Sequence, residues 1–185
     1  MENDEPRLAE VESETIHRAQ AGDEPALARI YDAYARPIYR YHFSRVGNAA
    51  DAEDLTSQTF MAVLEALPHY RHRERFTAWM FQIARNKAMD HFRRNHAVSD
   101  MTEAVADATQ ADALEAVYQR ESRSQLKQLV QQLDEEEREL LRLRFTAELS
   151  FVQIGQTLGR TEEAVRKAVR RILDRLAIQM EAHNA

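Results

Sequence analysis

The sequence predicts an all-α protein in which two small helical domains are joined by a flexible acidic linker. Only four glycines and four prolines occur in 185 residues, and the last proline is Pro68, so the residues that punctuate sheets are scarce. Hydrophobic residues make up 44% of the chain, enough to build cores, and they recur at helical spacing. Residues 96–121 interrupt this pattern with acidic residues and alanines that can bury little surface. We therefore expect two helical cores and no sheet.

Composition excludes several classes of protein. The chain has no cysteine, which excludes disulfides, thiolate metal sites and cysteine nucleophiles, and its seven histidines show no metal-ligand spacing. No apolar run approaches the roughly 20 residues needed to cross a bilayer, and the acidic segment 1–14 lacks the features of a signal peptide. We expect a cytoplasmic protein that has an acidic N-terminal tail, needs no metal or other cofactor, and does not insert into a membrane.

The first domain, residues 15–95, begins with a series of predicted helices. The apolar pattern starts at Ile16 and breaks at Ala21-Gly22-Asp23. Pro37 is expected to open a further helix, because proline fits the first turn better than a helix interior. Gly47-Asn48 closes that helix, since glycine readily takes the left-handed conformation of a C-terminal cap.

The next predicted helix, residues 51–67, combines a buried stripe with an acidic first turn. The expected stripe consists of Leu55, Phe60, Val63, Leu64 and Leu67. Asp51, Glu53 and Asp54 crowd the start of the helix, where acidic side chains complement the macrodipole. Capping is therefore a sufficient structural explanation of these acids, and docking on a basic partner surface is the functional alternative.

The segment 75–94 has one core face and one polar face. Its apolar positions are Phe76, Trp79, Met80, Ile83, Ala84 and Ala88, whereas Gln82, Asn86 and Arg93 share another side. Between residues 71 and 94, seven basic residues accompany only two acidic ones, in a chain of net charge −6. Cationic and aromatic side chains together can bind phosphates and unpaired bases. The alternative is a surface helix whose tryptophan anchors the core and whose arginines are solvated.

The C-terminal domain, residues 122–185, has the start and stop signals of a helix-turn-helix. Apolar residues at core spacing lead into it at Leu126, Leu129, Val130 and Leu133. Segments 134–137 and 150–153 both have the form of a capping box. Gly159 supplies a turn, and Thr161 can cap a last helix.

The last predicted helix, from Glu162 to about Met180, packs one face and exposes the other. The expected contacts join Phe151, Ile154 and Leu158 to Val165, Val169, Ile172 and Leu176. The residues expected to project outward are Glu163, Lys167, Arg170 and Arg171, flanked by Arg166. This spacing lets the helix lie in a DNA major groove. A small helical bundle with a solvated basic face is the alternative.

Three segments, in their order along the chain, resemble the extracytoplasmic-function (ECF) sigma factors, the smallest class of bacterial RNA polymerase sigma subunits. They read DAEDLTSQTF (51–60), FTAWMFQIARNKAMDHFRR (76–94) and LDEEERELLRLRFTAELSFVQIGQTLGRTEEAVRKAVRR (133–171). The resemblance implies a protein that binds core polymerase, recognises the −10 and −35 promoter elements and helps to melt the −10 duplex, without catalysing a reaction.

The resemblance also implies three sets of site residues. Those that would dock on the clamp helices of the largest polymerase subunit are Asp51, Glu53, Asp54, Leu55 and Gln58. Those that would meet −10 DNA, including a flipped base at loop 70–74, are Tyr70, Arg71, His72, Arg73, Trp79, Gln82, Arg85, Asn86 and Arg93. Those that would read the −35 duplex are Arg160, Thr161, Glu162, Glu163, Arg166, Lys167, Arg170 and Arg171. The polymerase flap and an anti-sigma factor are further implied partners.

Other functions are weighed against this one. A stand-alone helix-turn-helix regulator would bind duplex DNA without polymerase, and the acids at 51–54 would then only cap a helix. A sigma-like decoy that binds an anti-sigma factor would not need a basic recognition helix, yet six basic residues accompany three acidic ones between 160 and 175. A hydrolase lacks a coherent site, because no glycine loop cradles a phosphate. The chain ends soon after the last helix, so we expect no appended C-terminal domain.

Overall fold

The computed structural model describes residues 11–71, 75–95 and 124–183, and all regular structure in these ranges is helical. The elements are α1 (Ser13–Gln20), α2 (Glu24–Val46), α3 (Ala49–Ala66), the 3₁₀ turn η1 (Leu67–His69), α4 (Phe76–Asn95), α6 (Glu135–Leu141), the π-helical turn η3 (Arg142–Thr146), α7 (Phe151–Leu158) and α8 (Glu162–His183). Residues 124–131 are also helical. The predicted all-α class is confirmed for this part of the chain. The predicted linker, 96–121, and most of the N-terminal tail lie outside the described residues.

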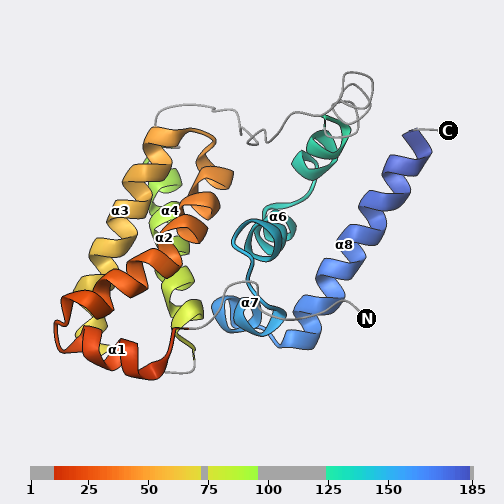
Figure 1. Ribbon diagram of the computed structural model, residues 1–185. Helices are drawn as coiled ribbons and strands as arrows, with labels where there is room; N and C mark the ends of the chain where they lie inside the picture. The colour runs from red at the N-terminus through yellow and green to blue at the C-terminus, as the bar shows by residue number, and fades with distance from the viewer. Residues whose placement is uncertain (1–10, 72–74, 96–123, 184–185) are drawn as a thin grey trace, which may run out of the picture.

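The helices form two units, as Figure 1 shows: α1–α4, the first unit, and α6–α8, the second unit. In the first unit α2 packs along α3, and α4 packs against both. Its largest fully buried side chains include Tyr34, Tyr41, Phe76 and Phe81. Helix α7 packs on α4, so the two units contact each other directly. None of the described helices combines the length and hydrophobicity that crossing a bilayer requires.

The predicted breaks in the first unit are confirmed by its caps. The Asp23 carboxylate accepts from the Ala26 amide at 2.8 Å, and the Asn48 side chain accepts from the Asp51 amide at 2.8 Å. Gly22 and Gly47 have φ angles of 84° and 73°, a left-handed conformation that glycine adopts without steric cost. These caps set where α2 and α3 begin and where α2 ends.

Two expectations for the first unit are wrong. Pro37 does not open a helix but lies inside α2, which is continuous from Glu24 to Val46. Proline removes one backbone hydrogen bond, yet Tyr34 and Ile38 on either side are fully buried, so tertiary packing keeps the helix whole. Leu64 was expected in the buried stripe and is 50% exposed, because it lies at the edge of the face that packs on the rest of the unit.

The second unit is a helix-turn-helix followed by a long helix. The capping box at Ser150 and Gln153 is complete, and Gly159 ends α7 with a φ of 68°. A Cβ on Gly155 would lie 2.6 Å from the carbonyl oxygen of Arg160, so the tight turn into α8 requires glycine there. The box expected at 134–137 is only half formed, because the Glu137 carboxylate binds Arg175 at 2.6 Å.

Candidate functional site

The N-terminus of α3 presents an acidic surface in which the three acids differ. Asp51 belongs to the cap, since its carboxylate accepts from Nδ2 of the Asn48 side chain at 2.8 Å. The carboxylate also lies 3.7 Å from Nε2 of His91. Glu53 and Asp54 are exposed, and Asp54 accepts from the Gln58 side chain at 2.6 Å. Glu53 and Asp54 are therefore the acids that a partner could reach directly.

Apolar side chains continue this surface along α3. Met61 is 62% exposed and Leu64 is 50% exposed, and Met61 lies seven residues after Asp54, on the same side of the helix. Leu55, expected among the docking residues, is fully buried and supports the helix from inside. Met61 was missed in the sequence, although the seven-residue spacing from Asp54 could have identified it. We call Glu53, Asp54, Gln58, Met61 and Leu64 the α3 face.

The aromatic candidates for −10 DNA are packed against each other. The Tyr70 ring is buried, with its centroid 4.7 Å from that of Trp79 and 5.3 Å from that of Phe76, and Trp79 is half-buried. Gln20 of α1 donates to the carbonyl oxygens of Leu67 at 3.0 Å and Tyr70 at 2.6 Å. This amide, which no local pattern in the sequence indicates, anchors the backbone that leads into residues 71–74.

The remaining −10 candidates differ in their accessibility. Arg71, Asn86 and Arg93 are exposed, and Arg93 forms an ion pair with Asp90 at 2.9 Å. His72 and Arg73 lie outside the described residues.

Two candidates on α4 contact the second unit. The Gln82 amide donates to the carbonyl oxygens of Gln156 at 3.1 Å and Thr157 at 3.4 Å, both on α7. Nε of Arg85 lies 3.5 Å from the Glu139 carboxylate on α6. Gln82 is therefore hydrogen-bonded to the chain's own second unit, whereas Arg85 makes only a long ion pair with it.

The start of α8 displays the candidates for duplex DNA. The Thr161 hydroxyl accepts from the Ala164 amide at 3.2 Å and so caps the helix, as predicted. The neighbouring charges form pairs within the helix: Arg166 with Glu162, Lys167 with Glu163 at 2.7 Å and Arg170 with Asp174 at 3.9 Å. Lys167 and Arg170 are 76% and 85% exposed at their side chains. Exposed pairs of this kind contribute little, so these cations can exchange their partners for phosphates.

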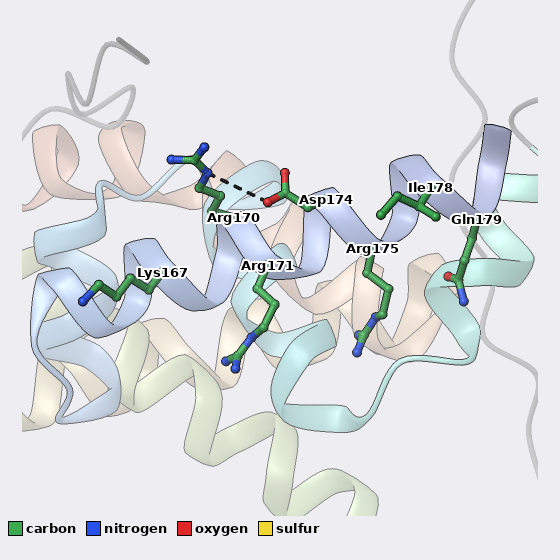
Figure 2. Close-up of a pocket in the computed structure, with 7 residues that line it drawn as sticks. All are labelled: Lys167, Arg170, Arg171, Asp174, Arg175, Ile178 and Gln179. Atoms are coloured by element: carbon green, nitrogen blue, oxygen red, sulfur yellow. Dashed lines mark ion pairs between the residues drawn. The ribbon is translucent and has the colours of Figure 1, made fainter. Parts of the chain in front are cut away.

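The basic face of α8 continues beyond the predicted residues. Lys167, Arg170, Arg171 and Arg175 line a shallow hollow together with Asp174, Ile178 and Gln179 (Figure 2). Figure 2 shows Arg170 and Asp174 on one side of the helix and Arg171 and Arg175 on the other. Three of these cations pair with Glu163, Asp174 and Glu137, so the surface carries a small excess of positive charge that a polyanion could enlarge by displacing the acids.

The buried ionisable groups serve packing. Burial, and secondarily the nearby Glu139 carboxylate, raises the pKa of Tyr41, so its hydroxyl remains a proton donor. Burial and the positive charge of Arg45 lower the pKa of His42 to about 3, which keeps its imidazole neutral. In the part of the chain that the structure describes, no group of three or more acidic or histidine side chains is placed to hold a metal ion. What the arrangement offers is a set of binding surfaces.

Comparisons with known proteins match the two units separately. The family model described as Sigma-70 region 2 matches residues 30–98, and the model described as Sigma-70, region 4 matches residues 129–177. The chain is 34% identical over 168 residues to the ECF RNA polymerase sigma factor BldN of Streptomyces coelicolor, covering 89% of this chain and 64% of BldN. It is 35% identical over 175 residues to the ECF RNA polymerase sigma factor ShbA of Streptomyces griseus, covering 87% of this chain and 91% of ShbA.

A solved structure shares the fold. CnrH, determined in complex with the cytosolic domain of CnrY, superposes with a TM-score of 0.65 at 21% sequence identity. The match covers 92% of this chain and 97% of CnrH.

Proposed function

This chain belongs to the family of ECF RNA polymerase sigma factors, and we propose that it binds core polymerase through the α3 face, melted −10 DNA through α4 and −35 duplex through α8. As a sigma factor it directs promoter-specific transcription initiation. We place it in the cytoplasm, where polymerase and promoter DNA are found, and assign it binding roles without catalysis.

The α3 face supports the polymerase contact. Exposed Glu53 and Asp54 supply charge, while Met61 and Leu64 supply apolar surface that would be buried on association. Interfaces commonly combine an apolar centre with a charged rim that guides the encounter. Gln58 lies between the two kinds of side chain and holds Asp54 in place.

The α4 surface supports contact with unpaired bases. Asn86 is exposed and can hydrogen-bond a base edge, Trp79 is half-buried against the Tyr70 ring, and Arg71 is exposed. A ring can stack on a base, and an amide can reach its Watson–Crick edge, only when the strands are separated, because stacking and pairing occupy both in a duplex.

One observation carries the assignment of the second unit. The helix that follows the α7 turn displays Lys167 and Arg170 almost fully to solvent, whereas its opposite side is buried on α7. A helix with this division can lie in a major groove with its cations at phosphates. An anti-sigma factor is a further proposed partner, supported by the family resemblance, and it would compete for these same exposed surfaces.

The test of the proposed function is charge reversal on the α3 face. We expect Glu53→Lys combined with Asp54→Lys to weaken binding to core polymerase at least about ten-fold, because like charges at an interface cost several kcal/mol. Run-off transcription should fall in parallel. Helix content should change little, since an acid in a first turn contributes only about 0.3–1 kcal/mol.

A matched control is available at the start of α1. Glu12→Lys combined with Glu14→Lys makes the same charge change at two exposed acids around another helix N-terminus. Equal polymerase affinity for the two double variants would contradict the docking assignment. Tight, sequence-specific binding of duplex promoter by the chain without polymerase would instead favour a stand-alone regulator.

A further inference from the structure

A buried charged cluster joins the two units. Tyr41 and Arg45 come from α2, and Glu139 comes from α6, at 0%, 7% and 4% exposure. The Tyr41 hydroxyl donates to Oε1 of Glu139 at 2.7 Å, and Nη1 of Arg45 lies 2.8 Å from Oε2 of Glu139 and 3.0 Å from the Tyr41 oxygen. Both carboxylate oxygens of Glu139 are therefore bound by the other unit.

Further ion pairs surround this cluster. Nη2 of Arg45 and Nη1 of Arg142 both donate to Oε1 of Glu135, each at 2.9 Å. At the periphery, Arg40 on α2 binds Glu148 at 2.7 Å. Glu148 has a φ of 62°, so the turn before α7 holds a non-glycine residue in a left-handed conformation where it supplies this contact. The contact is thus specified at several points.

A contact of this kind can specify one arrangement of the two units and still be weak enough for the units to separate. The attraction within a buried ion pair roughly balances the cost of removing both charges from water, so the pair adds little net stability over solvated charges. Removing one charge while its partner stays buried is costly, however. The cluster therefore favours one closed arrangement without locking it.

The closed arrangement occupies residues of α4 that DNA needs. The Gln82 amide donates to carbonyl oxygens of α7, and Arg85 lies against Glu139. The Gln82 amide cannot donate to α7 and to DNA at once, and Arg85 would have to leave the Glu139 carboxylate to pair with a phosphate. Closure of the two units and −10 binding through Gln82 and Arg85 therefore exclude each other.

We propose that the contact made by Tyr41, Arg45 and Glu139 is an autoinhibitory latch, which keeps the free chain closed until polymerase or DNA separates the units. The inference rests on the proposed role of α4 in −10 binding. The apparent affinity for −10 DNA then equals the affinity of the open form multiplied by the fraction of molecules that are open. No second protein is needed for this inhibition.

Energy transfer between two dyes on the full chain measures the open fraction. Because the chain has no cysteine, Glu14→Cys on α1 and Gln179→Cys on α8 give two unique labelling sites, both exposed. Glu139→Gln removes a negative charge that neutralises Arg45 when the units are closed, whereas in the open state water solvates Arg45. We therefore expect the variant to raise the open fraction at least about ten-fold. Glu136→Gln, an exposed neighbour on α6, is the matched control and should leave transfer unchanged.

A second pair of variants keeps the test valid if Glu139→Gln impairs folding. Arg40 and Glu148 are part-exposed, so reversing either charge should not disturb a core. Arg40→Glu and Glu148→Arg should each raise the open fraction about 1.5- to 5-fold, and the double variant should restore closure.

A binding measurement completes the test. The probe is a single-stranded oligonucleotide that carries the non-template −10 sequence of a promoter transcribed by the holoenzyme. Its affinity for the free chain should rise by the same factor as the open fraction. Equal transfer in Glu139→Gln and Glu136→Gln, or opening without a gain in binding, would overturn the latch. The proposed function can fail separately. If Glu139→Gln lowers energy transfer but the parent chain with core polymerase transcribes no promoter, the closed contact between the units is supported, whereas the proposed function and the inhibition of DNA binding are contradicted.

Discussion

The two helices proposed to bind DNA differ in what surrounds them. On α8, Lys167 and Arg170 are displayed to solvent, and each pairs with an acid one turn away, Glu163 and Asp174. On α4, Gln82 and Arg85 contact the other unit. The free chain therefore exposes the helix proposed to bind duplex DNA, whereas part of the helix proposed to bind melted DNA contacts the second unit. This difference suits the order of events at a promoter, where the duplex is met before the strands separate.

The two units also differ in their buried polar groups. The first unit encloses His42, whose Nε2 lies 3.0 Å from the Thr59 hydroxyl. That hydroxyl donates to the Leu55 carbonyl oxygen at 2.7 Å, so it accepts from Nε2–H of a neutral imidazole. In the described part of the second unit, 124–183, only His183 occurs, at the end of α8. Acid should therefore affect the two units unequally.

The largest expected effect is the loss of stability of the first unit in acid. The unfolded chain protonates His42 below about pH 6.5, whereas the folded chain, with its pKa lowered to about 3, does not. The unfolded state then binds more protons, so stability falls as pH drops through this window, by about 3 kcal/mol between pH 6.5 and 4. Electrostatic repulsion from Arg45 and His91 acts on the pKa of His42 in the same direction as burial.

Tryptophan fluorescence isolates this effect, because the chain's single tryptophan is Trp79 in the first unit. Urea unfolding should be followed from pH 7 to 4 in the parent and in His42→Gln, which cannot titrate. The stability of the variant should depend on pH less steeply by the stated amount. Parallel pH profiles for the two proteins would exclude His42 as the cause.

The next prediction concerns α4 in the holoenzyme. Replacing the exposed Asn86 by alanine removes a group that can hydrogen-bond an unpaired base, so promoter opening should slow by about ten-fold, equivalent to about 1.4 kcal/mol. Binding to a −35 duplex should not change. The rate of opening can be followed with a fluorescent base at −10.

Met89→Ala is the control, since Met89 is exposed on the same helix and carries no polar group. If both variants open promoters at the parent rate, α4 does not read the melted strand through Asn86.

How far the sequence could be read depends on the range of the interaction. Caps and turns such as Asn48 at α3 and Gly159 after α7 are local, and the residue types alone predict them. Pro37 was misread because its local preference is overridden by packing on distant helices. Arg45 and Glu139 are 94 positions apart, and Gln20 is 50 from Tyr70, so no periodicity indicates either contact.

The same limit applies to the sites. The outward residues of α8 follow from helical spacing, because one face is plainly apolar. Helical spacing predicted burial of both Leu55 and Leu64, and only Leu55 is buried, because the position of α3 against its neighbours leaves Leu64 exposed. Sequence thus predicts a helix face better than its edges.

The smallest expected effect tests whether α8 binds duplex DNA through phosphates. Lys167→Ala in the holoenzyme should weaken −35 binding and lower the slope of log affinity against log salt by about one unit, since each neutralised phosphate releases about one counterion. When salt rises from 50 to 200 mM, both proteins lose affinity, and the fold-loss of the variant should be about one third of the fold-loss of the parent. Arg36→Ala removes one exposed cation from α2 and should leave the slope unchanged. A base-specific role would instead reduce affinity for one promoter sequence at an unchanged slope, and an unchanged slope with unchanged affinity would show that the exposed face of α8 at Lys167 does not touch DNA.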